Sequence, residues 1–208
     1  MKYLILIITF SFIFLSCAKK DEEDATATSC ATDTTASGSI TVGSETLSGV
    51  YLSSCIDISS TAGGNIFPSD TKGAYIGVVV TGDTAITEEI LIYTDTTCST
   101  PSMTWKQART DFTVGSASGS NYAVTYKDGN TKVKPSTDVA ASHMNALAAS
   151  NTNISATFTN GTETTVTGSG STKYNLVLVT STTLRTGENS DNATPSALDS
   201  PEMTKACQ

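Results

Sequence analysis

The chain is poor in the residues from which metal and catalytic sites are usually built. Its 208 residues include one histidine, His143, and its five cysteines form no Cys-x-x-Cys pair. A zinc site would need ligands scattered along the chain, and a histidine without a recognisable acid or nucleophile partner makes no catalytic triad. We therefore expect no metal, no cofactor and no enzymatic activity, and we interpret His143 as a packing residue.

Positive charge is also scarce. The chain has 12 lysine and arginine residues against 20 aspartate and glutamate residues, and its net charge is −8. The basic residues are spread out and form no stripe, so nucleic acid is not an expected partner. The negative charge also argues against a protein that lies flat on anionic lipid.

The apolar run at the N-terminus is short. Leu4 to Leu15 is interrupted only by Thr9 and Ser11, and it follows the positive charge of Lys2. A helix needs about 20 apolar residues to span a bilayer, so this run is too short to do so and has the length of a signal-peptide core. The sequence predicts a signal peptide over residues 1–16.

The stretch FLSCAKKDEED, residues 14–24, resembles a lipobox, at which a diacylglycerol is attached to a cysteine before cleavage. Ser16 precedes Cys17, while Phe14 and Leu15 stand where a leucine and a small residue are usual. We predict that Cys17 is the first mature residue and carries lipid. Acyl chains contribute about 0.8 kcal/mol per buried methylene, so the bilayer is the expected partner. An ordinary signal peptide cut after Ser16, or a buried cysteine, are the alternatives.

Residues 17–38 read as a lipidated tether. The segment has almost no large apolar side chain, so it cannot bury enough surface to offset the entropy of ordering, and we expect it to stay mobile. Its acidic residues resemble the export tags of some bacterial surface lipoproteins. We therefore expect an exported, membrane-anchored protein in the outer membrane, on its periplasmic or its surface face.

Residues 39–208 have the size of one domain and the composition of a β protein. Thirty-seven threonines, with many Ser, Val and Ile, favour strands over helices. One helix is expected near 137–149, with Ser136 or Thr137 as N-cap. The expected strands are 47–55, 74–82 and 85–95 joined near Gly82-Asp83, 103–115, a hairpin over 120–134 around Asp128-Gly129, a hairpin over 153–168 around Asn160-Gly161, and 173–184, with 185–208 mostly irregular. Eight or nine short strands predict an antiparallel barrel or sandwich.

Charged residues inside two expected strands suggest a polar cluster. If 85–95 and 103–113 pair across a loop of about eight residues, Glu88 faces Arg109, Ile90 faces Gln107 and Ile92 faces Trp105. Such a cluster could lie in the mouth of a barrel, or it could be an exposed cross-strand pair contributing roughly 0.2–1 kcal/mol. The sequence leaves both readings open.

Several motifs between residues 45 and 205 resemble a lipocalin-like lipoprotein domain, of the type named for adenomatosis-polyposis-coli-down-regulated proteins. Tyr93, Asp95, Cys98 and Pro101 match its Tyr-x-Asp-x-x-Cys-x-x-Pro pattern. Tyr51 stands where that family has Trp, and Thr194-Pro195-Ser196 fits its late segment loosely. The resemblance implies a lipocalin-like, half-open β-barrel, which in some members binds lipid-like ligands.

With Cys17 lipidated, four cysteines remain and allow three pairings. We predict Cys55 with Cys98, because both lie at expected strand ends and the resembled family carries cysteines at both places. The other pair is then Cys30 with Cys207, which would join the two chain ends.

Two functions remain in view besides the disfavoured enzyme. Small Ser, Thr and Ala side chains dominate the strands, which favours a surface or interaction module whose barrel is a filled scaffold that contacts a surface protein. The alternative is a lipocalin-like carrier of a small apolar ligand. In that case the candidate ligand-binding residues are Tyr93, Trp105, Glu88 and Arg109.

Overall fold

The computed structural model describes residues 31–59, 67–151 and 154–207, and within them it is mostly antiparallel sheet with one helix. This confirms the predicted all-β fold with a single short helix. The strands are β1 (Ile40–Val42), β2 (Glu45–Leu47), β3 (Val50–Leu52), β4 (Ile56–Asp57), β5 (Gly73–Gly82), β6 (Ala85–Tyr93), β7 (Pro101–Ser118), β8 (Asn121–Pro135), β9 (Thr164–Val166), β10 (Thr172–Val179), β11 (Thr183–Thr186) and β12 (Met203–Cys207), and the helix is α2 (Asp138–Ser150).

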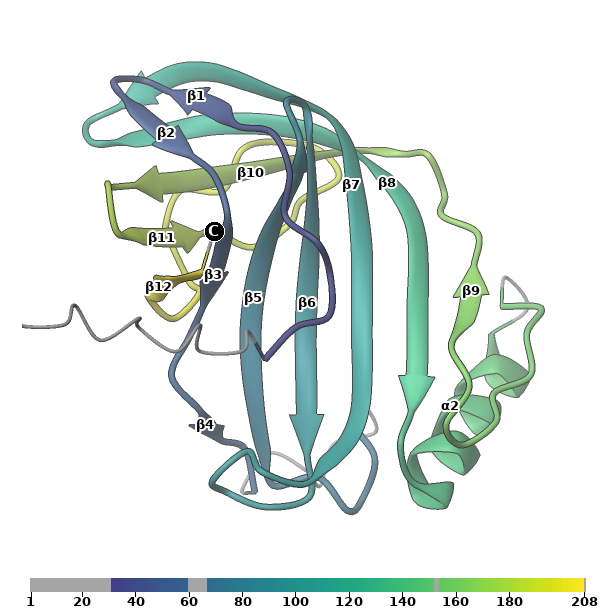
Figure 1. Ribbon diagram of the computed structural model, residues 1–208. Helices are drawn as coiled ribbons and strands as arrows, with labels where there is room; N and C mark the ends of the chain where they lie inside the picture. The colour runs from purple at the N-terminus through teal and green to yellow at the C-terminus, as the bar shows by residue number, and fades with distance from the viewer. Residues whose placement is uncertain (1–30, 60–66, 152–153, 208) are drawn as a thin grey trace, which may run out of the picture. The chain divides into compact units, whose positions relative to one another are not determined.

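Eight strands close into a ring. Their order is β10-β11-β12-β3-β5-β6-β7-β8, and β8 pairs back onto β10 through residues 122–127. The other half of β8 leaves the ring and pairs with β9 through residues 131–133. Closure is therefore limited to one half of the long strands, and Figure 1 shows β8 running on towards α2 at the other half, with β9 beside it.

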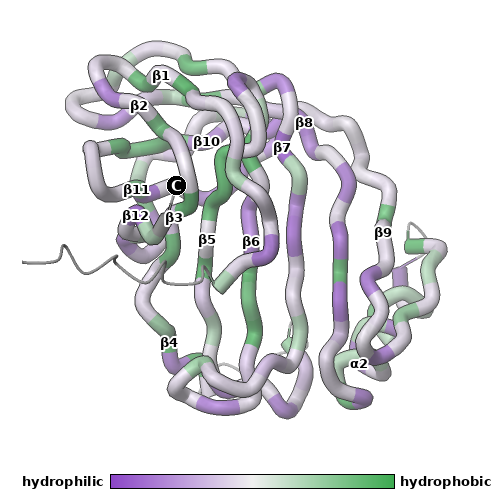
Figure 2. Tube along the Cα trace, viewed as in Figure 1, coloured by the Kyte–Doolittle hydropathy of each residue, from purple (hydrophilic) through white to green (hydrophobic). Residues whose placement is uncertain are grey.

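Two apolar clusters fill the two halves. The first includes Tyr51, Val80, Phe112 and Val177 inside the closed half. The second joins Ile92, Met103, Val133, Met144 and Phe158 between the sheet and α2. In Figure 2 hydrophobic residues gather where β3, β5 and β10 approach one another, whereas β8 carries many hydrophilic ones. Each large buried side chain contributes about 1.5–3 kcal/mol, so both clusters hold the sheet in shape.

Helix α2 forms where its sequence predicts it. Thr137 is the N-cap and its hydroxyl accepts a hydrogen bond from the Ala140 backbone amide at 3.0 Å. Asp138 lies in the first turn, where its negative charge interacts favourably with the helix dipole and stabilises the helix. Ala140 and Met144 are buried against the second cluster, so the narrow apolar stripe anchors the helix.

The predicted hairpin around Asp128-Gly129 is wrong, because both residues lie inside the continuous strand β8. The turn falls earlier, at residues 119–120, where Gly119 has φ +64. At Asp128-Gly129 the ladder with β7 shifts: Gln107 pairs with Thr131 but Arg109 with Asp128, so β8 carries one extra residue. The dipeptide makes a β-bulge instead of a turn.

Other predicted boundaries also change. The segment 47–55 divides into β2 and β3, and 173–184 into β10 and β11, which turn at residues 180–182. The expected hairpin at 153–168 keeps its turn at Asn160-Gly161 but has only one strand, β9. The tail expected to be irregular contributes β12, which bridges β11 and β3 and so completes the ring.

The loop after β6 is organised by Asp95 and a disulfide. The Asp95 carboxylate accepts hydrogen bonds from the Thr97 hydroxyl and from the backbone amides of Ser99 and Thr100, and these bonds lower the pKa of that carboxyl. Cys98 adopts φ +53 and bonds Cys55, with 5.9 Å between their Cα atoms. The predicted Cys55–Cys98 pairing is confirmed, and Asp95 orders the loop that carries Cys98.

Cys17 and Cys30 lie outside the described residues, as does the predicted signal peptide. The proposed pairing of Cys30 with Cys207 is therefore not observed, although the backbone of Cys207 belongs to β12.

Part of the predicted tether packs against the sheet, so the expectation of a mobile segment up to residue 38 is wrong for 32–38. A compact unit begins at Thr32, which is buried. Asp33 forms an ion pair with Lys106 of β7, Thr34 donates to Glu89 of β6, and the Ser37 amide donates to the Val80 carbonyl at 2.8 Å. Polar contacts, not apolar burial, hold this strap (residues 32–39), which is why composition alone did not reveal it.

Candidate pocket inside the ring

A pocket of about 390 Å3 opens inside the ring, between the two apolar clusters. Its volume lies within the usual range for small-molecule sites of about 300–1,000 Å3. Strands from both sides of the ring and the segment after β11 line it: Ile76, Gly77, Val78, Glu88, Glu89, Ile90, Trp105, Gln107, Arg109, Asn175, Thr186, Gly187, Asn189 and Met203. At this place the interior of the ring is not filled by side chains.

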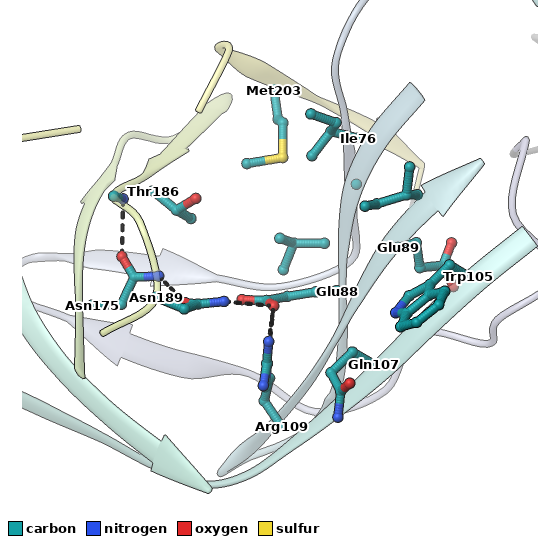
Figure 3. A pocket seen from close by; sticks show the side chains of 14 residues that line it. Ile76, Glu88, Glu89, Trp105, Gln107, Arg109, Asn175, Thr186, Asn189 and Met203 are labelled. Atoms are coloured by element: carbon teal, nitrogen blue, oxygen red, sulfur yellow. Dashed lines mark hydrogen bonds and ion pairs between the residues drawn. The ribbon is translucent and has the colours of Figure 1, made fainter. Parts of the chain in front are cut away.

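Three of the four candidate ligand residues line this pocket and one does not. Glu88, Trp105 and Arg109 are on its wall, as Figure 3 shows. Tyr93 is absent from the lining, and its ring instead packs edge-on against Tyr75 with 5.6 Å between centroids. Side chains alternate along β6, so Tyr93 and Glu88 point to opposite faces of that strand.

The predicted strand register is two residues out. Glu88 pairs with Gln107, Ile90 with Trp105 and Ile92 with Met103, because β7 begins at Pro101 and the connecting loop is shorter than expected. A shift of two keeps the same face inward. Glu88 and Arg109 consequently still meet, now along a diagonal.

Arg109 joins two carboxylates in the interior. Its Nε and Nη2 atoms donate to Glu88 Oε2 at 2.9 and 2.6 Å, and Nη1 donates to Asp128 Oδ1. The Arg109 side chain is 9% exposed, while those of Glu88 and Asp128 are 23% and 15% exposed. Lys173 Nζ lies 3.5 Å from Asp128 Oδ2. Lys173 also pairs with Asp191, so the cluster sets two positive against three negative charges, and each buried charge has an opposite partner.

A second set of polar groups continues this network across the ring. The Tyr126 hydroxyl lies 3.2 Å from Glu88 Oε1 and also contacts Asn189 Oδ1. The Asn175 amide nitrogen donates to the same hydroxyl at 3.0 Å. Burial, followed by the charge of Glu88, raises the pKa of Tyr126, so the hydroxyl keeps its proton. Asn189 Nδ2 completes the path with a bond to Glu88 Oε2 at 3.2 Å (Figure 3).

Several members of this network were missed from the sequence. Asn175 had a signal in the sequence, because it interrupts the apolar run YNLVLV. In the structure it is 2% exposed. Asp128 was hidden by its Asp-Gly context, which favours a turn. Asn189 had no local signal, since it lies outside the named strands, between two isolated bridges and 101 residues from Glu88.

The pocket combines apolar and polar walls. The apolar wall of Ile76, Ile90, Trp105 and Met203 faces polar groups that hydrogen-bond one another. Within residues 31–59, 67–151 and 154–207 no group of three or more His, Cys, Asp or Glu side chains could hold a metal ion. No helix in that same part of the chain is long and apolar enough to cross a membrane.

Comparison of the chain with protein-family models and with the sequences of curated proteins gives no match.

Proposed function

We propose that this chain is an exported lipoprotein, anchored in a membrane through an acylated Cys17, whose ring of strands is a half-open lipocalin-like β-barrel that binds a small ligand. The observation that carries the ligand-binding part is the 390 Å3 pocket with Trp105 on one side and the Glu88–Arg109 pair on another. The anchoring part rests on the apolar N-terminal run that ends at Ser16-Cys17.

The pocket lining indicates the character of the ligand. Trp105, Ile76 and Met203 offer an apolar surface, while Glu88 presents a carboxylate whose side chain is 23% exposed. Aromatic and apolar walls with a few fixed polar groups are typical of ligand sites. The ligand is thus an amphipathic small molecule with an apolar body and a polar end, rather than a wholly apolar one.

Fluorescence tests this proposal directly, because Trp105 is the only tryptophan in the chain. N-phenyl-1-naphthylamine has an apolar body and one N–H donor. We expect it to quench Trp105 emission saturably and to gain fluorescence of its own. Thr186→Phe, which fills the pocket, should abolish binding, whereas Thr182→Phe at an exposed turn should leave it unchanged. Absence of quenching, or equal binding by both variants, would contradict ligand binding.

A surface or interaction module is the second candidate. It is favoured by the hydrogen bonds that the interior polar groups make with one another, which leave Glu88, Arg109 and Asn175 paired without a ligand. In that case the barrel is a scaffold and its loops contact a surface protein. A native mass spectrum of the purified domain separates the two: a co-purifying small molecule supports the carrier, and the polypeptide mass alone supports the module.

A further inference from the structure

Three interior side chains surround the carboxamide of Asn189 as a binding site surrounds a ligand. Asn189 Oδ1 contacts Asn175 Nδ2 and the Tyr126 hydroxyl, and its Nδ2 donates to Glu88 Oε2 at 3.2 Å. A carboxamide presents one acceptor and two donors in a plane, and each side here meets its complement. We propose that Glu88, Tyr126 and Asn175 form a recognition site for ligands that carry a carboxamide, and that Asn189 occupies this site when no ligand is bound. The inference rests on the proposed ligand-binding function.

The site is held in place independently of Asn189. Asn175 Oδ1 accepts hydrogen bonds from the backbone amides of Leu176 at 2.6 Å and Gly187 at 2.9 Å. These bonds fix the orientation of the Asn175 amide, so its nitrogen must face Asn189. A donor fixed in this way costs little entropy when a ligand binds.

Tyr126 and Glu88 are held equally firmly. The Tyr126 ring is 2% exposed, stacks on Phe112 with 5.8 Å between centroids, and has the Arg109 guanidinium 5.2 Å above its centre. Glu88 Oε2 is fixed by the two bonds from Arg109. The three recognising groups come from β6, β8 and β10, and the ladder pairs β8 directly with β10, so the sheet sets their spacing.

The side chain of Asn189, by contrast, can move out of this site. It is exposed and lies between two isolated bridges, Gly187 with Leu198 and Tyr174 with Ser190. Gly187 and Ser190 stay bonded to β10 through their backbones, so Asn189 can leave by rotation of its exposed side chain alone, which is a fast motion. Its departure would open the carboxamide site towards the apolar wall of the same pocket, which includes Ile76, Trp105 and Met203.

This geometry narrows the ligand class. A carboxylate in place of the carboxamide would lie against the Glu88 carboxylate, and an ester would offer Glu88 no donor. An amine would offer Asn175 no acceptor. The ligand that fits is an amide or urea joined to an apolar body that packs on Trp105.

The test uses three probes that differ only in the polar group: 2-naphthamide, methyl 2-naphthoate and 2-naphthoate. In 15N-labelled protein the only tryptophan gives one indole N–H resonance, which reports on the pocket wall. We expect 2-naphthamide to bind about tenfold more tightly than the other two, which corresponds to about one to two hydrogen bonds.

Two variants test the role of Asn189. Asn189→Ala removes the internal competitor and should tighten 2-naphthamide binding several-fold, because the fraction of open site rises. Asn192→Ala, the same change at an exposed position of the same segment, should have no effect.

The outcomes separate this inference from the proposed function. Equal affinity for the three probes, or an Asn189→Ala variant that binds 2-naphthamide no better than wild type, overturns the carboxamide site even if N-phenyl-1-naphthylamine still binds. Failure of N-phenyl-1-naphthylamine as well overturns ligand binding itself.

Discussion

Within the ring, the guanidinium of Arg109 contacts two carboxylates that come from different strands, Glu88 of β6 and Asp128 of β8. Removing the cation would leave two negative charges together in a partly buried space. Such a loss costs more than the net worth of the intact pair, because Glu88 loses its ion-pair partner and Asp128 keeps only Lys173, at 3.5 Å.

We therefore expect Arg109→Met to lower the free energy of unfolding by about 3 kcal/mol. The matched control is Lys127→Met, which removes a pair with Asp111 whose side chains are 52% and 64% exposed and should cost under about 1 kcal/mol. Urea denaturation measures both. A loss for Arg109→Met no larger than for Lys127→Met would contradict a structural role for the interior pair.

For single residues, the sequence predicted which side chains share a face of a strand, but not which residues they contact. Glu88, Trp105 and Arg109 were found because alternation places them together even when the register slips by two. Tyr93 lies outside the pocket lining because it belongs to the other face of β6. Asn189 could not be found, since its contacts depend on how a distant loop crosses the closed ring.

Among the elements, the strap at residues 32–39 is held mainly by side-chain contacts, and one of them depends on the protonation state of Asp33. Lys106 bonds Asp33 and lowers the pKa of that carboxyl below its ordinary value. A carboxyl with a lowered folded-state pKa contributes stability above its unfolded pKa of about 3.9 and loses it as the pH falls through the folded value. Docking of the strap should accordingly weaken in acid.

Asp33→Asn should weaken docking at neutral pH as well. We expect exchange of the Ser37 amide hydrogen, which is bonded to Val80, to become several-fold faster than in wild type. Asp111→Asn, which alters another exposed ion pair on β7, serves as the control. Unchanged Ser37 protection in Asp33→Asn would show that the ion pair does not hold the strap.

The disulfide is a second link between elements. It joins the segment between β3 and β4 to the loop between β6 and β7. It spans a sequence separation of 43 residues, for which the chain-entropy model gives about 4 kcal/mol. We expect the double variant Cys55→Ala, Cys98→Ala to lose about this much stability in guanidinium denaturation. A loss under 1 kcal/mol would mean that the bond adds little to a loop already ordered by Asp95.

Hairpins show which elements could be predicted. The turn at Gly82-Asp83 was correct because the Gly-Asp pair separates two runs that are rich in β-branched residues. The Asp128-Gly129 hairpin was wrong because the same dipeptide also suits a bulge, and the pairing of Asp128 with Arg109 decides between the two. β12 was missed because a short strand that completes a ring depends on its two neighbours, not on its own sequence.

For the whole molecule, the proposed anchor at Cys17 makes a simple prediction. Cys17→Ser should move the protein from the membrane fraction to the soluble fraction and abolish incorporation of labelled palmitate. Thr32 and the rest of the folded unit are unaffected by this change, so the released protein should keep the same circular dichroism spectrum. A variant that still partitions with membranes and takes up palmitate would refute lipidation at Cys17.

The docked strap also limits the distance between the proposed anchor at Cys17 and the folded unit. If Cys17 is fixed in a bilayer, the fourteen residues 18–31 join it to Thr32, and a chain of that length reaches at most about 50 Å. Release of the strap adds the eight residues 32–39, or about 28 Å more. The contact between Asp33 and Lys106 would then govern how far from the membrane the mouth of the pocket can travel to meet its ligand.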